Sequence, residues 1–133
     1  MFLEGTQSAT MEFNGDTNAN YSRTYTANGA TDVGQSDKNY IGITLNTTTC
    51  FISGIVSNNA SQEKYFIQHN AERMATGHDS DAKTPESFEL YGKWVRTSGS
   101  GTGDSSAQIT RIDLDKAGSN FTAKSILKVW GHD

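Results

Sequence analysis

The amino-acid sequence predicts an all-β protein, an antiparallel β-sandwich of about eight strands in two four-stranded sheets. Short runs rich in β-branched and aromatic residues recur at a spacing of roughly 8–12 residues. The segments between them, such as FNGDTNANY, SNNAS and SGSGTGDSS, carry the Gly, Asn, Asp and Ser that turns require. Helical periodicity is nearly absent, and any helix is expected to be a single turn near Ala71–Ala75.

Four strands are expected in the first half of the chain. Ala9–Phe13 alternates weakly between apolar and polar side chains, and Tyr21–Ala27 places its two tyrosines on one face. NYIGITL alternates more regularly, whereas CFISGIVS is apolar on both faces, which is typical of a central strand. The dipeptides Asn14-Gly15 and Asn28-Gly29 predict tight turns, because both residue types tolerate positive φ.

Four further strands are expected in the second half. EKYFIQHN places Tyr65 and Ile67 on one face and Phe66 on the other, and ESFELYGKWV gathers its large apolar side chains on one face. QITRIDL and SILKVW follow. The predicted core consists of the residues assigned to the inward faces of these strands: Ile41, Ile43, Leu45, Ile52, Val56, Ile67, Phe88, Leu90, Trp94, Ile112, Leu114, Leu127 and Val129.

The last of these strands, SILKVW, is expected to close the sandwich. Leu127 and Val129 share one face, and Trp130 would cover the open end. Without this strand an edge would stay unpaired and prone to aggregation. Removal of the chain from Ser125 onward is therefore expected to abolish soluble folding.

Length and composition predict a single domain over residues 1–133. Hydrophobic residues make up only 34% of the chain, which favours thin sheets and burial shared with other copies. A net charge of −4 without a Lys/Arg cluster argues against nucleic acid as a partner. No apolar run approaches a membrane span, and MFLEGT lacks the features of a signal peptide, so we expect no membrane association.

The sequence contains no catalytic motif and no recognisable cofactor or metal site, so a non-enzymatic protein is expected. Cys50 is the single cysteine and lies in a strand-like run, where a buried thiol is the simplest interpretation. The three histidines are scattered. His78–Asp81 is the most metal-like stretch, but it lacks the spaced carboxylates of a calcium loop and is expected to be a solvated turn.

A glycoside hydrolase remains an open alternative, because such enzymes need two carboxylates at a defined separation that a sequence cannot show. Glu86 and Glu89 fall on opposite faces of one predicted strand, and Glu12 and Glu63 cannot be placed near either. SGSGTGDSS has no lysine in the phosphate-binding position and precedes a strand, so it is not a P-loop.

The order of phrases in this chain resembles that of small structural proteins of tailed phages. SNNASQEKYFIQHN is followed by ESFELYGKWVRTSG and then by AQITRIDLDKAGSNFTAKSILKVWG. In that group an asparagine-rich turn leads to a Lys-containing strand, then to a GKW strand, and the chain closes on an aromatic-Gly pair. MEFNGDTNANYSRTY is similar to their openings, so the resemblance covers Met11–Gly131. The loop Thr97–Ser106 is longer than expected in that group.

The resemblance implies a jelly-roll-like sandwich that belongs to the virion and is made in the host cytoplasm. It implies a capsid decoration or cement protein that binds non-covalently to other virion proteins, such as the major capsid protein, as a homo-oligomer and most often a trimer. It lends no catalytic residue. The alternative function is a receptor-binding tail-fibre tip or glycan-binding module that contacts a host glycan.

Four aromatic side chains are expected to form contacts between subunits. They fall on the second faces of the predicted strands, and the polar loops have little apolar surface with which to cover them. Packing against other copies would remove this surface from water. The expected contact residues are Phe51, Phe66, Tyr91 and Trp130.

Overall fold

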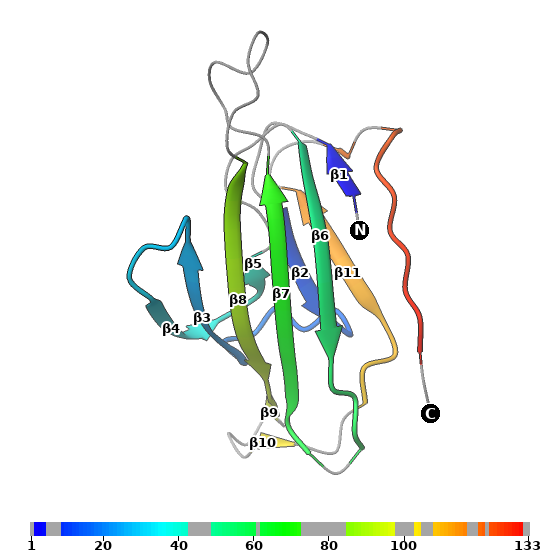
Figure 1. The fold of residues 1–133 in the computed structure, drawn as a ribbon. Coiled ribbons are helices and arrows are strands. Elements are labelled where there is room, and N and C mark those ends of the chain that lie inside the picture. Colours follow the sequence, from blue (N-terminus) through cyan, green and yellow to red (C-terminus); the bar gives the residue numbers. More distant parts are fainter. Residues whose placement is uncertain are drawn as a thin grey trace, which may run out of the picture.

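The computed structural model shows an all-β chain in which two antiparallel sheets pack against each other as a β-sandwich, as the sequence predicts (Figure 1). No helix occurs among the residues that the structure describes. These residues are 2–4, 9–42, 49–60, 62–72, 85–97, 103–104, 108–116, 120–121 and 123–131.

The larger sheet has six strands within the described residues, all antiparallel. Its centre is formed by the long strands β6, β7 and β8, and a hairpin, β3–β4, extends one side (Figure 1). In spatial order the strands are β1 (Phe2–Glu4), β6 (Thr49–Val56), β7 (Lys64–Glu72), β8 (Glu86–Trp94), β3 (Tyr21–Ala27) and β4 (Val33–Lys38).

The smaller sheet lies behind the larger one in Figure 1 and has three strands in the described part of the chain. Its order is β11 (Ile112–Lys116), β2 (Ala9–Phe13) and β5 (Ile41–Gly42), and a separate ribbon pairs β9 (Arg96–Thr97) with β10 (Gly103–Asp104). The even division into two four-stranded sheets was therefore wrong. The strands at the chain's beginning and in the β3–β4 hairpin extend the edges of the larger sheet instead.

An aromatic cluster joins the two sheets. The ring of Phe13 on β2 packs edge-on against Trp94 of β8 at 5.8 Å and against Phe66 of β7 at 6.2 Å between centroids. Tyr21 of β3 stacks on Trp94 at 6.4 Å. Large aromatic side chains bury much apolar area, and edge-to-face contacts add to that stabilisation. This cluster therefore fixes the small sheet over the end of β8.

A buried carboxylate completes the polar side of this cluster. Asp16 follows β2 and accepts hydrogen bonds from the Nε1 of Trp94 at 2.8 Å, the Nδ2 of Asn20 at 2.7 Å, and both the backbone N and the Nδ2 of Asn18. The Tyr21 hydroxyl donates to the Asp16 carbonyl and accepts from the backbone N of Phe13. The indole N–H and the tyrosine hydroxyl therefore enter the interior with their hydrogen bonds made.

The two Asn-Gly turns are confirmed. Asn14 and Gly15 have φ values of 56° and 67°, and Asn28 and Gly29 have 52° and 70°, as a tight turn with two left-handed residues requires. The side chain of Asn14 also accepts from the backbone N atoms of residues 110 and 111, so this turn holds the segment that leads into β11.

Much of the predicted core is confirmed. Ile41, Ile52, Phe88, Leu90 and Trp94 are buried. Three other members, Val56, Ile112 and Leu114, are half-buried and pack against the core. Ile43 and Leu45 lie outside the described residues.

The inward face predicted for β7 was wrong. Ile67 is 42% exposed, whereas Phe66 is buried. Residues that pair directly across antiparallel strands share a face, and Gln68 pairs with the fully buried Leu90. The register with β8 therefore turns the even-numbered residues of β7 inward, and the set consists of Lys64, Phe66, Gln68 and Asn70.

The prediction that SILKVW forms a closing strand is also wrong, because these residues are not paired as a strand. After a turn at residues 123 and 124, residues 125–131 run as an extended segment along one side of the sandwich, with a single β-bridge at Ile126 (Figure 1). Leu127 and Val129, expected in the core, are exposed, and Trp130 is 81% exposed. Alternation of apolar residues favours an extended conformation, but a strand also needs a neighbouring strand with which to form backbone hydrogen bonds.

Two smaller expectations have clear outcomes. Cys50 is a buried cysteine on β6, as its strand-like setting predicts. The expectation that any helix is at most one turn near Ala71–Ala75 agrees with the structure, in which no described residue is helical: Ala71 and Glu72 end strand β7, and residues 73–75 lie outside the described residues.

Candidate binding surface

The outward face of the larger sheet carries a row of exposed apolar side chains. Ile55 of β6 pairs with Ile67 of β7, and Ile67 pairs with Tyr91 of β8, so the three side chains stand next to one another across three strands. Their exposed fractions are 76%, 42% and 51%, respectively. We call Ile55, Ile67 and Tyr91 the apolar row.

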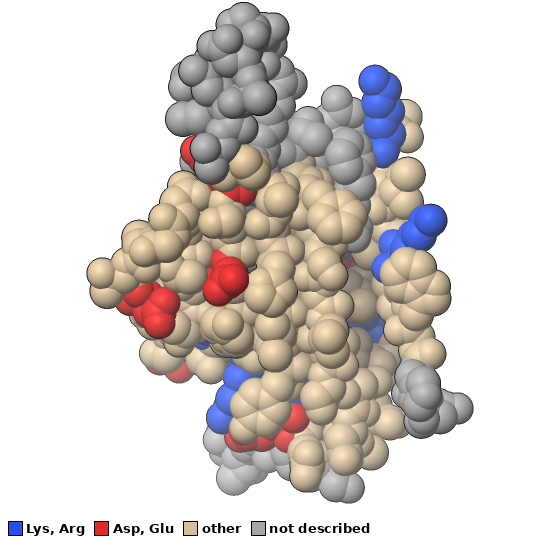
Figure 2. Space-filling view, in the orientation of Figure 1, with Lys and Arg blue, Asp and Glu red and all other residues tan. Residues whose placement is uncertain are grey.

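Two aromatic side chains enlarge this surface. Tyr65 lies on β7 two residues from Ile67 on the same face, and Phe51 lies on β6 further along the same face as Ile55. Both are more than half exposed. Figure 2 shows this side of the molecule as a largely uncharged surface with only a few acidic and basic side chains. Contiguous exposed apolar surface of this kind marks sites of interaction.

Charged residues lie on either side of the apolar row. On one side, the Nδ1 of His69 is 3.5 Å from the Oε1 of Glu89. On the other side, the Nζ of Lys93 is 2.9 Å from the Oε1 of Glu63, whose Oε2 accepts a hydrogen bond from the Tyr65 hydroxyl at 2.9 Å. The row is thus bordered by polar groups that interact with one another, which is the arrangement of an interface with an apolar centre and a polar rim.

The electrostatics of this rim favour a charged carboxylate. The hydrogen bond from Lys93, followed by that from Tyr65, holds the pKa of Glu63 below its usual value. The hydrogen bond that Tyr65 donates to Glu63 raises the pKa of the Tyr65 hydroxyl, which therefore stays a neutral donor. Near neutral pH this rim therefore presents a fixed cation–anion pair beside an aromatic ring.

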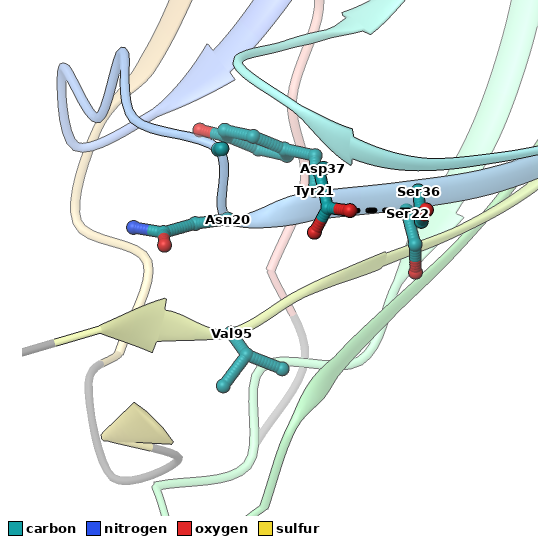
Figure 3. A pocket seen from close by; sticks show the side chains of 7 residues that line it. Asn20, Tyr21, Ser22, Ser36, Asp37 and Val95 are labelled. Atoms are coloured by element: carbon teal, nitrogen blue, oxygen red, sulfur yellow. Dashed lines mark hydrogen bonds between the residues drawn. The ribbon is translucent and has the colours of Figure 1, made fainter. Parts of the chain in front are cut away.

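A small hollow of about 180 Å³ lies at the β3–β4 hairpin (Figure 3). The register of the two strands shifts between Tyr21 and Arg23, and Asp37 adopts a φ of 53°. Ser36 donates a hydrogen bond to the Asp37 carboxylate at 3.2 Å, marked by the dashed line in Figure 3, and both residues line the hollow together with Ser22.

The four predicted contact residues do not lie on one surface. Phe51 and Tyr91 lie on the outward face of the larger sheet. Trp130 is exposed, but it belongs to the extended segment 125–131. Phe66 is not available for a contact between subunits, because it packs inside the sandwich against Phe13.

Sequence reasoning missed the members of this surface that β7 contributes and also missed Ile55. A signal for them was present, because CFISGIVS is apolar on both faces and Tyr65 and Ile67 alternate with equally plausible core residues. A strand with apolar residues on both faces is typical of a fully buried strand, but here the second face of β6 and β7 is exposed on the outside of the larger sheet.

The carboxylates considered for glycoside hydrolysis are separated by the fold. Glu86 and Glu89 alternate on β8 as expected, Glu63 is paired with Lys93, and Glu12 belongs to β2 of the other sheet. Among the described residues no group of three or more His, Cys, Asp or Glu side chains could hold a metal ion. His78–Asp81 lies outside the described residues.

Comparisons with protein-family models, with curated proteins and with solved structures find no match for this chain. In the part of the chain that the structure describes, no helix is long and apolar enough to cross a membrane.

Proposed function

We propose that this chain is a structural protein of a tailed-phage virion, a capsid decoration or cement protein that acts by non-covalent binding. It would be made in the host cytoplasm and would assemble with copies of itself and with other virion proteins, such as the major capsid protein. The trimeric form is implied by the sequence resemblance alone.

The observation that carries this proposal is the exposed apolar row on an otherwise polar chain. Only 34% of the residues are hydrophobic, yet Ile55, Ile67 and Tyr91 stand together on the solvent side of a sheet. A chain with so little apolar surface gains stability from covering such a row, at roughly 25 cal/mol per Å² of apolar area removed from water. A structural protein of a particle would cover this row when it assembles with its neighbours.

The arrangement also suits binding without chemistry. The row lies on the longest strands of the sheet, which are held by ladders on both sides and by the core beneath them. Side chains on such a support lose little freedom when a partner binds, so less of the binding energy is spent on ordering them. Repetition of the same contact over a symmetric particle then multiplies a modest affinity.

Mass spectrometry of particles purified from the source of the sequence tests this proposal. We expect the chain among the particle proteins, at hundreds of copies for a capsid component and at a few tens or fewer for a tail component. Particles that lack the chain, although cells producing them contain it, would overturn the proposal.

A second candidate function is a receptor-binding tip or glycan-binding module. It is favoured by Tyr65 and Tyr91, two exposed rings at diagonal positions of neighbouring strands on which a sugar could stack. Binding to a glycan array that Tyr91→Ala abolishes, without a change in the melting temperature, would favour this candidate over the first.

A further inference from the structure

The charges beside the apolar row have a symmetry that selects a partner. On β8, Glu89 and Lys93 lie two residues before and two residues after Tyr91, on the same face. They are therefore at equal distances, about 7 Å, on opposite sides of the row. Their charges are opposite.

A two-fold axis along the row relates these charges in a favourable way. Rotation by 180° about that axis brings a second copy of the sheet face to face with the first and exchanges the two sides of the row. Glu89 of one copy then faces Lys93 of the other, and Lys93 faces Glu89. The apolar row meets itself, because an isologous contact places the same patch on both sides.

We propose that the outward face of the larger sheet binds a second copy of this chain through a two-fold contact along the apolar row, with Glu89 and Lys93 of each copy facing Lys93 and Glu89 of the other. This inference rests on the proposed function, because it names the partner that the outward face of the larger sheet binds during assembly. A trimer would need a different surface, because an isologous contact uses this face in pairs.

The size of the face fits a dimer of moderate affinity. Strands β7 and β8 each contain nine residues, and with β6 and β3 they form four adjacent strands. At about 3.3 Å per residue and about 4.8 Å between strands, the face measures roughly 30 by 20 Å, or about 600 Å². Two such faces reach the lower end of specific interfaces, about 1,200 Å² in total. Two packed sheets would stand about 10 Å apart, as in a sandwich.

The charge pattern argues for a copy of this chain over an unrelated partner. A partner without the same symmetry would have to supply its own cation opposite Glu89 and its own anion opposite Lys93. A second copy supplies both with no further requirement, and the paired charges prevent other registers in which like charges would meet.

Charge reversal tests this contact by sedimentation velocity on the full chain, from about 1 to 100 µM in low salt. Glu89→Lys places two lysines on one chain, and Lys93→Glu places two glutamates on one chain. Each variant alone makes both interchain pairs repulsive, so we expect its dimer dissociation constant to rise by about tenfold or more. An equimolar mixture of the two variants places lysines opposite glutamates, and its association should return to the wild-type level.

The mixture separates the proposed contact from local effects. Lys93→Glu also breaks the pair with Glu63 inside the chain, and Glu89→Lys places a cation beside His69, but mixing cannot repair either change. Lys124→Glu and Asp32→Lys, at exposed positions outside this face, are matched controls that should leave the dimer unchanged. Circular dichroism confirms that each variant is folded.

Three outcomes would overturn the inference. They are a wild-type chain that stays monomeric at 100 µM, an oligomer that neither single variant weakens, and single variants whose mixture does not associate. Each of these leaves the proposed function intact if the chain is found in particles, because another surface could then make the contact. Conversely, a dimer with the expected charge dependence would stand even if particles lacked the chain.

Discussion

Replacement of Asp16 by alanine tests the polar network that joins β2, β3 and β8. Asp16 is 9% exposed, and its side chain accepts a hydrogen bond from the Nε1 of Trp94, a residue that is 1% exposed. A hydrogen bond to a charged acceptor contributes about 1.5–3 kcal/mol, and its loss here leaves a buried indole N–H without an acceptor. Water can replace the bonds to Asn18 and Asn20, which are exposed or half-buried, so they add little.

We therefore expect Asp16→Ala to lower the free energy of unfolding by about 2–3 kcal/mol, which corresponds to roughly 6–12 °C in melting temperature. Urea denaturation followed by tryptophan fluorescence measures it. Asp32→Ala, at an exposed position, is the matched control and should change stability by less than about 0.5 kcal/mol. A loss of less than 0.5 kcal/mol for Asp16→Ala as well would refute this account of the network.

An amide should not replace this carboxylate. The Oδ1 of Asp16 accepts from two donors of Asn18, and the Oδ2 accepts from Asn20 and Trp94, so both oxygens face N–H groups. Asp16→Asn places an NH₂ group against one of these donor pairs. We expect it to destabilise the protein by at least about 1 kcal/mol. Wild-type stability for Asp16→Asn would show that the bond to Trp94 needs no charged acceptor.

The same network predicts a pH dependence. Burial raises the pKa of Asp16, but the hydrogen bonds from Asn20, Trp94 and Asn18 outweigh it, so the pKa lies below its usual value. A carboxyl group whose pKa is lower in the folded state contributes stability above its unfolded pKa, about 3.9, and loses it as the pH falls through the folded pKa. The stability difference between the wild type and Asp16→Ala should therefore be constant from pH 5 to 7 and shrink below about pH 4.

Three other substitutions test separate features. Glu12 pairs with Asp113 across β2 and β11, and burial, then the charges of Asp113 and Asp115, raise its pKa, so its ionised form destabilises the fold. Glu12→Gln should stabilise the protein by about 0.2–1 kcal/mol at pH 7. This gain should fade as the pH falls through the raised pKa of Glu12. Equal stability of the two proteins at pH 7 would argue against repulsion between Glu12 and the neighbouring aspartates. Leu90→Ala, at a fully buried position, should cost about 2–5 kcal/mol in urea denaturation, and a cost below 0.5 kcal/mol would contradict its place in the core. A chain that ends at Lys124 should fold with nearly wild-type circular dichroism, because the side chains that follow are mostly exposed; an unfolded product would restore the closing-strand interpretation.

The sequence by itself determines the local structure of this protein. Asn14-Gly15 and Asn28-Gly29 form tight turns because these residue types adopt positive φ at low cost wherever the chain must reverse. The alternation in ESFELYGKWV places Phe88, Leu90 and Trp94 on the buried face, since these large apolar residues recur at every second or fourth position, whereas the opposite face is polar apart from Tyr91. The all-β fold class follows from such local patterns.

The orientation of β7 was decided only in the tertiary structure. Tyr65 and Ile67 on one face, and Phe66 on the other, give two faces of similar apolar character, so periodicity cannot choose between them. The choice comes from the pairing of Gln68 with Leu90, because a shift of one residue in register would turn every side chain of β7 to the opposite face. The exposed apolar row is a consequence of that register.

Contacts between distant parts of the chain were equally out of reach of local patterns. Asp16 and Trp94 are 78 residues apart, and nothing in GDTN indicates that its carboxylate will accept from an indole. SILKVW has the composition of a strand, but a strand exists only where a neighbouring edge offers its N–H and C=O groups, and residues 123–131 make a single bridge. Sequence therefore determines which conformations are locally favourable, whereas the register and the available edges determine which faces are buried and which strands are paired.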